Sequence, residues 1–217
     1  HNGDRARPAL LAALAEGGSV AYCSDAGTPL VADPGYRLAL DAAEAGARVH
    51  ALPGPSAALA ALSLSGLPSD RFLFLGFPPS TATARQTWLR KWLAVDSTLI
   101  LFESPRRVNR TLADLCQIDP DRITVIAREL TKKFEEVIRG TAAELAADPR
   151  IATLKGEVVI VLDRPSEVVV DDDRLRQVLE RHMATMSIKD AAREAAQELG
   201  LSRRDVYQRA LELGGQK

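Results

Sequence analysis

Residues 24–36 have the sequence Ser-Asp-Ala-Gly-Thr-Pro-Leu-Val-Ala-Asp-Pro-Gly-Tyr, and the fold can be worked out from them. A short apolar run, Val20–Cys23, precedes the stretch and predicts a buried strand. The segment that follows, Arg37–Glu44, predicts an amphipathic helix. The stretch is therefore expected at the carboxyl end of a strand, where open α/β sheets bind ligands.

The residue types of this loop suit a ligand. Gly27 can adopt a positive φ and lets a ligand approach the backbone. The two prolines of the loop fix φ and stiffen it. Asp25 supplies an acceptor and Thr28 a hydroxyl. Two simpler interpretations stay open: Asp25 caps a helix or turn, and the Asp-Pro-Gly at 33–35 is an ordinary turn signal.

Composition excludes several classes of protein. The 217 residues are 46% apolar and 26% charged, which is typical of a soluble globular chain. A net charge of -1 gives no global field toward nucleic acid or membrane. Cys23 and Cys116 lack metal-ligand spacing, and three histidines make a histidine-built metal site improbable, so we expect no metal and a reduced, cytoplasmic setting. No apolar run approaches the ~20 residues that cross a membrane. The abrupt start at His1 resembles the middle of a protein.

Alternating β and α patterns predict α/β architecture in two parts. In the first part we expect helices at 6–16, 37–45 and 57–64 and strands at 20–23 and 48–52, which implies a parallel sheet. A breaker cluster, Ser65–Asp70, marks the boundary. In the second part we expect strands at 72–77, 98–102, 123–127, 134–139 and 157–162, with 134–139 antiparallel to its neighbour, and helices at 83–93, 107–116 and 142–147. Trp88 and Trp92 share one helix face, as core residues or as a ligand platform.

The tail, after an acidic linker at 164–173, is expected to be all-helical. Ser187–Asp190 predicts a capping box that opens a second helix, and Gly200 ends that helix. Ser202 is expected to cap a third helix, so that the pair resembles a helix-turn-helix. From Arg174 on, nine Lys and Arg residues face six Asp and Glu residues. A small packing module and a nucleic-acid contact both fit this modest excess.

Four ordered motifs carry a resemblance to a known family. They are Ser-Asp-Ala-Gly-Thr-Pro-Leu at 24–30 with Asp-Pro-Gly at 33–35; Leu-Pro-Gly-Pro-Ser-Ala at 52–57; Gly-Leu-Pro-Ser-Asp-Arg-Phe at 66–72 with Gly-Phe at 76–77; and Phe-Glu-Ser-Pro-Arg-Arg at 102–107 with Ala-Arg-Glu-Leu-Thr-Lys at 127–132. The set resembles the tetrapyrrole-methylase superfamily of class III S-adenosylmethionine-dependent methyltransferases. It is most similar to the ribosomal-RNA branch, which methylates a cytidine 2′-hydroxyl in 16S rRNA. The family's opening strand and Gly-Asn-Leu type loop have no match here.

The resemblance implies two α/β domains with S-adenosylmethionine in the cleft between them, followed by a small helical domain. It divides the chain into 1–66, which lacks the start of the family domain, 67–165, and a helix-turn-helix-like domain at 174–217. The residues it implies around the cofactor are Asp25, Ala26, Gly27, Thr28, Ser56, Ala57, Phe102, Glu103, Ala127, Gly156 and Glu157. Ser56 and Ala57 are expected to hold the methionine carboxylate at a helix start. Alternatively, Ser56 is an N-cap, and Glu103 pairs with Arg106 or Arg107.

On the acceptor side, a base or a cation would help a weakly acidic ribose hydroxyl react. Glu129 is the first candidate base with Glu135 behind it, and Lys132 or Arg128 would favour the oxyanion. Each of these is also explained as a solvated charge at a strand end. The residues expected to meet RNA phosphates are Arg71, Arg106, Arg107, Arg128, Arg203 and Arg204, with surface solubility as the alternative.

The resemblance implies partners as well: 16S rRNA or the small ribosomal subunit, and a second copy of the chain in a homodimer. Two rival functions stay open. One is methylation of a tetrapyrrole or another small molecule. The other is a catalytically incomplete module that binds RNA or the ribosome.

Overall fold

The computed structural model describes residues 3–32, 35–165, 172–201 and 203–214. The chain divides into two compact units, residues 1–165 and residues 166–217, and each is described by itself. The first unit is a mixed α/β structure and the second is all-helical, as the sequence predicts.

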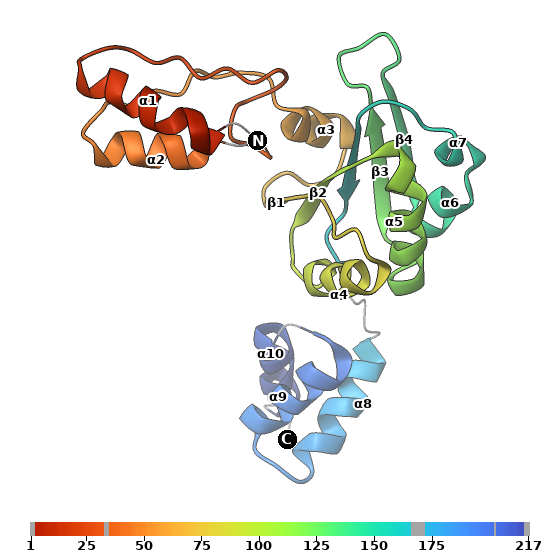
Figure 1. The fold of residues 1–217 in the computed structure, drawn as a ribbon. Helices are drawn as coiled ribbons and strands as arrows, with labels where there is room; N and C mark the ends of the chain where they lie inside the picture. The colour runs from red at the N-terminus through yellow and green to blue at the C-terminus, as the bar shows by residue number, and fades with distance from the viewer. Residues whose placement is uncertain (1–2, 33–34, 166–171, 202, 215–217) are drawn as a thin grey trace. The chain divides into compact units, whose positions relative to one another are not determined.

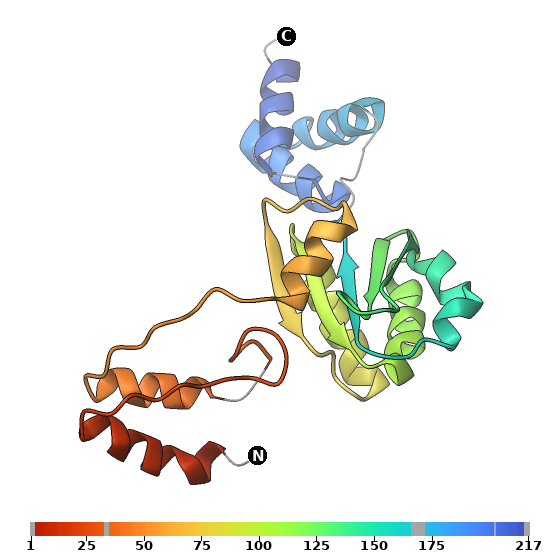
Figure 2. The same cartoon turned by 90° about the horizontal axis from the view of Figure 1, so that it is seen from above.

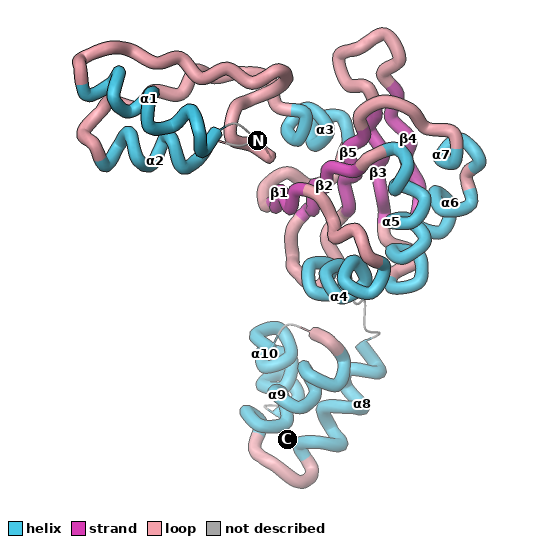
Figure 3. The backbone as a smooth tube through the Cα atoms, in the orientation of Figure 1, coloured by secondary structure: helices cyan, strands magenta, loops and turns pink. Residues whose placement is uncertain are grey.

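The described part of the first unit contains one five-stranded sheet in the order β1-β2-β5-β3-β4 (Figure 1; β5 is labelled in Figure 3). Its strands are β1 (Phe72–Gly76), β2 (Thr98–Glu103), β3 (Ile123–Arg128), β4 (Glu136–Thr141) and β5 (Val158–Leu162). β1 and β2 are parallel, and the other neighbouring pairs are antiparallel. The antiparallel pairing predicted for 134–139 is confirmed, with the strand beginning at Glu136.

The central strand β5 explains why the sheet is covered on both faces. All its residues are buried, and a strand sends successive side chains to opposite faces. Val158, Ile160 and Leu162 pack with helices on one face, whereas Val159 and Val161 pack with another helix on the other face. The first face is covered by α4 (Ala82–Leu93), α5 (Pro105–Ile118), α6 (Ala142–Ala147) and α7 (Pro149–Ala152).

The second face is covered by α3 (Ala57–Ser65), whose Ala58, Ala61 and Leu62 are buried against β2, β3 and β5. The Arg139 guanidinium on β4 donates to the carbonyl oxygens of Leu64 and Ser65 at the helix end. The N-terminal domain predicted from the sequence includes this helix, whereas in the structure the helix packs on the sheet of residues 72–162. The boundary at residue 66 stays a prediction.

Trp88 and Trp92 are core residues, since both pack from α4 against the buried cluster of the first face. The prediction of a core role for them is confirmed.

The two strands predicted at 20–23 and 48–52 are wrong. Both segments are loop in Figure 3, and within the described residues neither carries a ladder hydrogen bond. Tyr22 is 41% exposed and Leu52 is 86% exposed. A short apolar run becomes a buried strand only when a neighbouring strand satisfies its backbone groups, and the described chain places none beside these segments. The flanking helices α1 (Gly3–Ala15) and α2 (Tyr36–Glu44) are present and pack on each other, with Arg7 and Asp41 3.1 Å apart (Figure 2).

The second unit contains α8 (Asp172–Met183), α9 (Ile188–Leu199) and α10 (Arg203–Gly214). Its core is built from small and branched side chains, among them Leu179, Ala195 and Val206. The Ser187 hydroxyl accepts a bond from the Asp190 amide at the start of α9, and Gly200 ends this helix in the left-handed conformation. Only half of the predicted capping box forms, because Ser187 Oγ itself donates to the Asp190 carboxylate. The predicted cap at residue 202 lies outside the described residues.

Candidate active site

One cavity of about 490 Å³ brings together segments from across the first unit. It is lined by Asp25, Ala26, Gly27, Thr28, Val31, Ala32, Ser56, Ala57, Phe77, Phe102, Glu103, Ser104, Pro105, Gly156, Glu157, Val158 and Val159. The lining contains every residue predicted around the cofactor except Ala127, and it contains seven further residues that were not predicted. The loop at 24–32, the start of α3 and the ends of two strands therefore share one space.

A hydrogen bond holds the first loop against the second. Thr28 Oγ1 donates to the Pro55 carbonyl oxygen over 2.8 Å, which joins the 24–30 motif to the 52–57 motif. Ser24 Oγ donates to the Gly27 carbonyl oxygen over 2.7 Å and closes the turn between them. The Asp25 carboxylate accepts no hydrogen bond from the described part of the chain, so Ser24 and not Asp25 stabilises the turn. Asp25 is exposed at the cavity and available to a ligand.

The same loop stores backbone strain. Leu30 and Ala32 have φ values of 72° and 58°, in the left-handed region that non-glycine residues rarely adopt. Gly35, with φ 126°, is the N-cap residue of α2, and a Cβ there would lie 2.8 Å from a Leu30 methyl carbon and 2.9 Å from the Tyr22 ring. Strained residues cluster where a site needs a fixed loop shape. The Asp-Pro part of the predicted turn at 33–35 lies outside the described residues.

The start of α3 offers backbone donors to the cavity. Ser56 is the N-cap, and its Oγ accepts from the Leu59 amide over 3.4 Å. The first amides of a helix have no partner within the helix, and together with the helix dipole they favour an anion. Ser56 and Ala57 both line the cavity, so the capping role and the predicted carboxylate contact are compatible.

Glu103 reaches the cavity from the end of β2, yet its side chain is fully buried. Its two carboxylate oxygens accept from the Ser104 amide at 2.8 Å and from the Thr111 hydroxyl at 2.7 Å. Arg107 Nε lies 3.3 Å from the same carboxylate. The predicted ion pair with Arg107 is therefore present, and Glu103 fixes the turn from β2 into α5.

The aromatic wall of the cavity is fixed by two arginines. Phe77 stacks edge-on with Phe102 at 5.8 Å between ring centroids. Arg107 donates to the Pro78 carbonyl oxygen over 2.6 Å, and Arg85 donates to the Ser80 carbonyl oxygen over 3.1 Å. Arg85 is itself buried against Asp114, 2.6 Å away. The loop that carries Phe77 is thus clamped at both ends.

The rim beside Glu157 is a three-residue ion network. Lys132 Nζ lies 2.9 Å from Glu129 Oε1 and 2.9 Å from Glu157 Oε2. Glu129 Oε1 also accepts from the Glu157 amide over 2.9 Å. Glycine at 156 permits this approach, because a Cβ there would lie 2.3 Å from the Glu129 carboxyl carbon. Glu129 itself has a φ of 48°.

These contacts shift two pKa values in opposite directions. The hydrogen bond from the Glu157 amide, followed by that from Lys132, lowers the pKa of Glu129. Hydrogen bonds to Glu157 and then to Glu129 raise the pKa of Lys132. Lys132 is therefore held as a cation and Glu129 as a carboxylate at neutral pH.

Comparison with known proteins decides the family. A family model described as tetrapyrrole (corrin/porphyrin) methylases matches residues 1–146, and a model described as the RsmI C-terminal HTH domain matches residues 169–214. The chain belongs to the tetrapyrrole methylase family. The fold class predicted from the motifs is confirmed.

Two relatives of this tetrapyrrole methylase are both named ribosomal RNA small subunit methyltransferase I. The protein from Mesorhizobium japonicum is 48% identical over 98% of this chain and 73% of its own length. The protein from Escherichia coli O157:H7 is 40% identical over 99% of this chain and 77% of its own length. Among solved structures, the methyltransferase CobJ aligns with a TM-score of 0.58 at 24% identity, covering 79% of this chain and 74% of that chain.

Other predicted site residues of this methylase lie away from the cavity lining. Ala127 is fully buried on β3 in the cluster under α3. Glu135 Oε2 accepts from the Thr131 amide over 2.6 Å and supports the loop between β3 and β4. The roles predicted for these two residues stay predictions.

The predicted RNA-binding arginines of the methylase fall into three groups. Arg107 and Arg128 are engaged with Glu103 and Glu136. Arg71 is exposed and lies 2.8 Å from Asp96, and Arg106 is exposed on α5. Arg203 and Arg204 are exposed in the C-terminal unit and line a second cavity there.

Several cavity residues of the methylase were missed by the sequence analysis, namely Val31, Ala32, Phe77, Ser104, Pro105, Val158 and Val159. For Phe77 a signal existed, since it closes the Gly-Phe pair at 76–77 of the third motif. Val158 and Val159 gave no signal, because an apolar strand residue beside a ligand has the same sequence pattern as one in the core.

Proposed function

We propose that this chain transfers a methyl group from S-adenosylmethionine to the 2′-hydroxyl of a cytidine ribose in 16S rRNA of the small ribosomal subunit. The observation that carries the proposal is the single cavity onto which the motifs at 24–30, 52–57 and 102–107 converge. The relatives named rRNA small subunit methyltransferase I support the RNA as acceptor.

The residues of the cavity fit the methyl donor. A volume of about 490 Å³ is in the ordinary range of roughly 300–1,000 Å³ for a small-molecule site. Phe77 and Phe102 offer an apolar wall for an adenine ring, and the N-terminus of α3 offers amides for a carboxylate. Asp25 offers a free carboxylate for the amino group or for the ribose hydroxyls.

When bound, S-adenosylmethionine supplies an electrophilic methyl group on a sulfonium. The transfer is a one-step displacement, so the protein's task is to position the hydroxyl and exclude water. The clamped Phe77 loop and the Thr28–Pro55 bond give the walls a fixed shape before any ligand enters. Rigid walls reduce the ordering that binding requires.

On the acceptor side, we assign Lys132 as the cation that favours the developing oxyanion. Its raised pKa keeps it charged in the working range. The lowered pKa of Glu129 makes this carboxylate a weak base, so its first role is to hold Lys132 and the 156–157 turn. The candidate base role of Glu129, with Glu135 behind it, is tested by the pH profile of methyl transfer.

For the RNA, we propose Arg71, Arg106, Arg203 and Arg204 as phosphate contacts, since their side chains are exposed. We further propose that the enzyme works as a homodimer in the cytoplasm. Exposed apolar side chains on the helices, such as Leu40 on α2 and Leu59 on α3, support a partner surface. Within the described residues, no helix has the length and apolarity that crossing a membrane requires.

The deciding experiment combines calorimetry with methyl transfer. The chain is titrated with S-adenosylmethionine, then incubated with the labelled donor and either naked 16S rRNA or small subunits, and the modified sugar is mapped. Heat of binding and label on one cytidine ribose are expected. Heat without RNA labelling would favour a small-molecule methyltransferase, and an absence of heat would favour a binding module without catalysis.

A further inference from the structure

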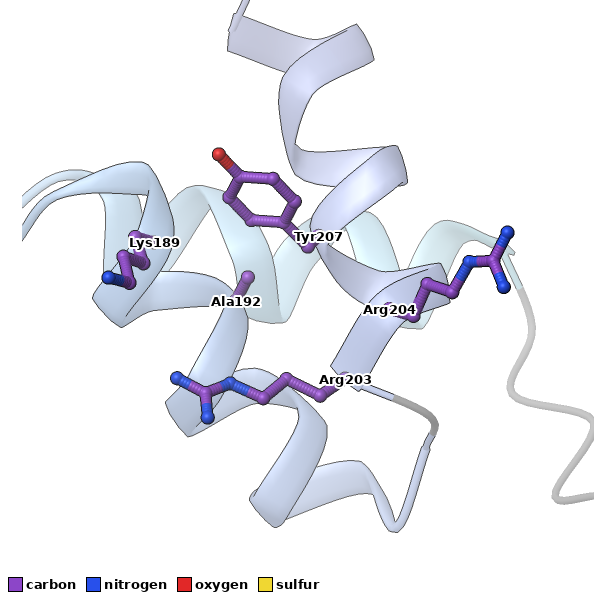
Figure 4. A pocket seen from close by; sticks show the side chains of 5 residues that line it. All are labelled: Lys189, Ala192, Arg203, Arg204 and Tyr207. Carbon is purple, nitrogen blue, oxygen red and sulfur yellow. The ribbon is translucent and has the colours of Figure 1, made fainter.

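A second cavity, of about 790 Å³, lies in the C-terminal unit between α9 and α10. It is lined by Lys189, Ala192, Arg203, Arg204 and Tyr207 (Figure 4). We call it the α9–α10 cup. It shares no residue with the candidate active site.

The cup is lined by one small side chain, that of Ala192, and by long side chains around it. Ala192 on α9 is 1% exposed and belongs to the hydrophobic core of this unit, so it lies at the bottom of the cup. Arg203 and Tyr207 are four residues apart on α10, so they share one helix face. Figure 4 shows Lys189, Arg203 and Tyr207 around Ala192, whereas Arg204 points to the other side of α10. The side chains of Lys189, Arg203 and Tyr207 therefore surround one cavity.

In the described part of the chain, the lining of the cup carries three cationic side chains and no carboxylate. Within the described residues, Lys189, Arg203 and Arg204 form no ion pair. The nearby Asp190 carboxylate is engaged by the Ser187 hydroxyl at 2.7 Å and by Arg193 at 3.1 Å. The hydrogen bond from Ser187, and then the charges of Arg193, Lys189 and Arg203, lower the pKa of Asp190, so this carboxylate offsets part of the positive charge beside the cup.

Tyr207 adds a flat surface to this positive hollow. Its side chain is 40% exposed on a helix whose other large apolar residue in the same turn, Val206, is buried. Exposed aromatic rings next to cations are the means by which proteins hold unstacked bases and their phosphates. A-form duplex RNA has a deep and narrow major groove that side chains do not enter. A cup with an upright ring therefore suits an unpaired nucleotide and not a duplex.

We propose that the α9–α10 cup binds an unpaired RNA nucleotide, with its base stacked on the Tyr207 ring and its flanking phosphates on Lys189 and Arg203. The inference rests on the proposed function insofar as RNA is the acceptor. The inference goes beyond the proposed function by naming the form of RNA that binds and the residues that recognise this RNA. The C-terminal unit then anchors a single-stranded segment of the substrate at a site of its own.

The test uses the full chain and fluorescein-labelled RNA 12-mers, one single-stranded and one in a duplex, with binding followed by fluorescence anisotropy. Tyr207→Ala is expected to weaken single-strand binding about tenfold, since a stacked base contributes roughly that factor. Tyr207→Phe keeps the ring and is expected to stay within about twofold of the unmodified chain. The double variant Lys189→Ala/Arg203→Ala is expected to lower the salt slope by about 1.4, which is about 0.7 for each phosphate contact on a single strand.

Arg176→Ala is the matched control, because it removes an exposed arginine from α8, outside the cup. It is expected to leave single-strand binding unchanged. The proposal is overturned if Tyr207→Ala binds the single strand as well as the unmodified chain does, or if the duplex binds equally well with the same dependence on Tyr207. Calorimetry of the unmodified chain with S-adenosylmethionine separates this result from a failure of the proposed function, because donor binding does not involve the cup.

Discussion

Gly156→Ala probes the contact that builds the rim of the cavity proposed to bind the methyl donor. Gly156 has a φ of 87°, and a Cβ there would lie 2.3 Å from both Cδ and Oε1 of Glu129. The left-handed conformation alone costs an alanine ~1–2 kcal/mol. Ordinary contact begins near 3.4 Å, so the Glu129 carboxylate must also retreat by about 1 Å. That retreat breaks its bonds to Lys132 and to the Glu157 amide.

Gly46 supplies a matched control for the backbone part of the cost. Its φ is 83°, and nothing lies within 4 Å of a Cβ built there. Gly46→Ala is therefore expected to lose only the ~1–2 kcal/mol of the conformation. The excess loss in Gly156→Ala measures the clash with Glu129. The double variant Gly156→Ala/Glu129→Ala removes the carboxylate and should return the cost of Gly156→Ala to that of the control.

Urea unfolding followed by tryptophan fluorescence is the assay for these variants. Both tryptophans, Trp88 and Trp92, lie on α4 and pack against the core of the first unit, so their signal reports that unit alone. Donor affinity, measured by calorimetry on the same samples, is expected to fall in Gly156→Ala and to hold in Gly46→Ala, because only Gly156 lines the cavity. Equal losses of stability in the two single variants would refute the argument, and so would a double variant that shows no coupling.

Three further outcomes are expected. Asp25→Ala weakens donor binding in calorimetry without changing the unfolding midpoint, because the carboxylate accepts no hydrogen bond from the described chain; an unchanged affinity removes Asp25 from the site. Glu103→Ala is expected to lower the free energy of unfolding of the first unit by about 3–5 kcal/mol, measured by urea unfolding, because it leaves the partners of a buried carboxylate unsatisfied. Glu103→Gln is expected to cost less, because its amide oxygen still accepts the bond from the Ser104 amide. The lowered pKa of Glu129 stabilises the fold above its unfolded value near 4.5, and this contribution is lost as pH falls through the folded pKa, so the stability difference between the unmodified chain and Glu129→Gln vanishes in acid. A stability difference between the unmodified chain and Glu129→Gln that persists in acid would contradict the assignment of the rim network. Lys132 does not titrate in this range, because its raised pKa gives a contribution that is present below 10.5 and is lost only as pH rises through the folded value.

Most elements of residues 57–162 follow from local patterns. β5 is predicted because five consecutive Val, Ile and Leu residues flanked by turn signals have few alternatives to a buried strand. The helix boundaries at Ser56, Gly66, Ser187 and Gly200 follow from capping chemistry, which depends on the residue and its immediate neighbours. The ordered motifs predict a set of cofactor contacts, which stays a prediction, and the cavity contains all of that set except Ala127.

The failures share a cause, which is that a strand and many side-chain contacts need a partner distant in the sequence. Residues 20–23 and 48–52 have strand composition, yet the described chain gives them no neighbour, so they stay irregular and exposed. From the sequence, Arg107 could bind an RNA phosphate or pair with a nearby carboxylate. In the structure it pairs with Glu103, four residues earlier, and donates a hydrogen bond to the distant Pro78 carbonyl oxygen. No spacing rule relates Glu129 to a glycine at position 156, although their contact shapes the rim.

By itself, then, the sequence determined the order of motifs, the family and the second unit's three helices, because caps, turns and apolar periodicity act within a few residues. Only the tertiary structure decided which loops face one another. It also decided which charged side chains are held in ion pairs and hydrogen bonds within the protein, and which are left for a ligand to contact. These depend on distances between segments such as Thr28 and Pro55, or Glu129 and Gly156, that the folded chain alone brings within contact.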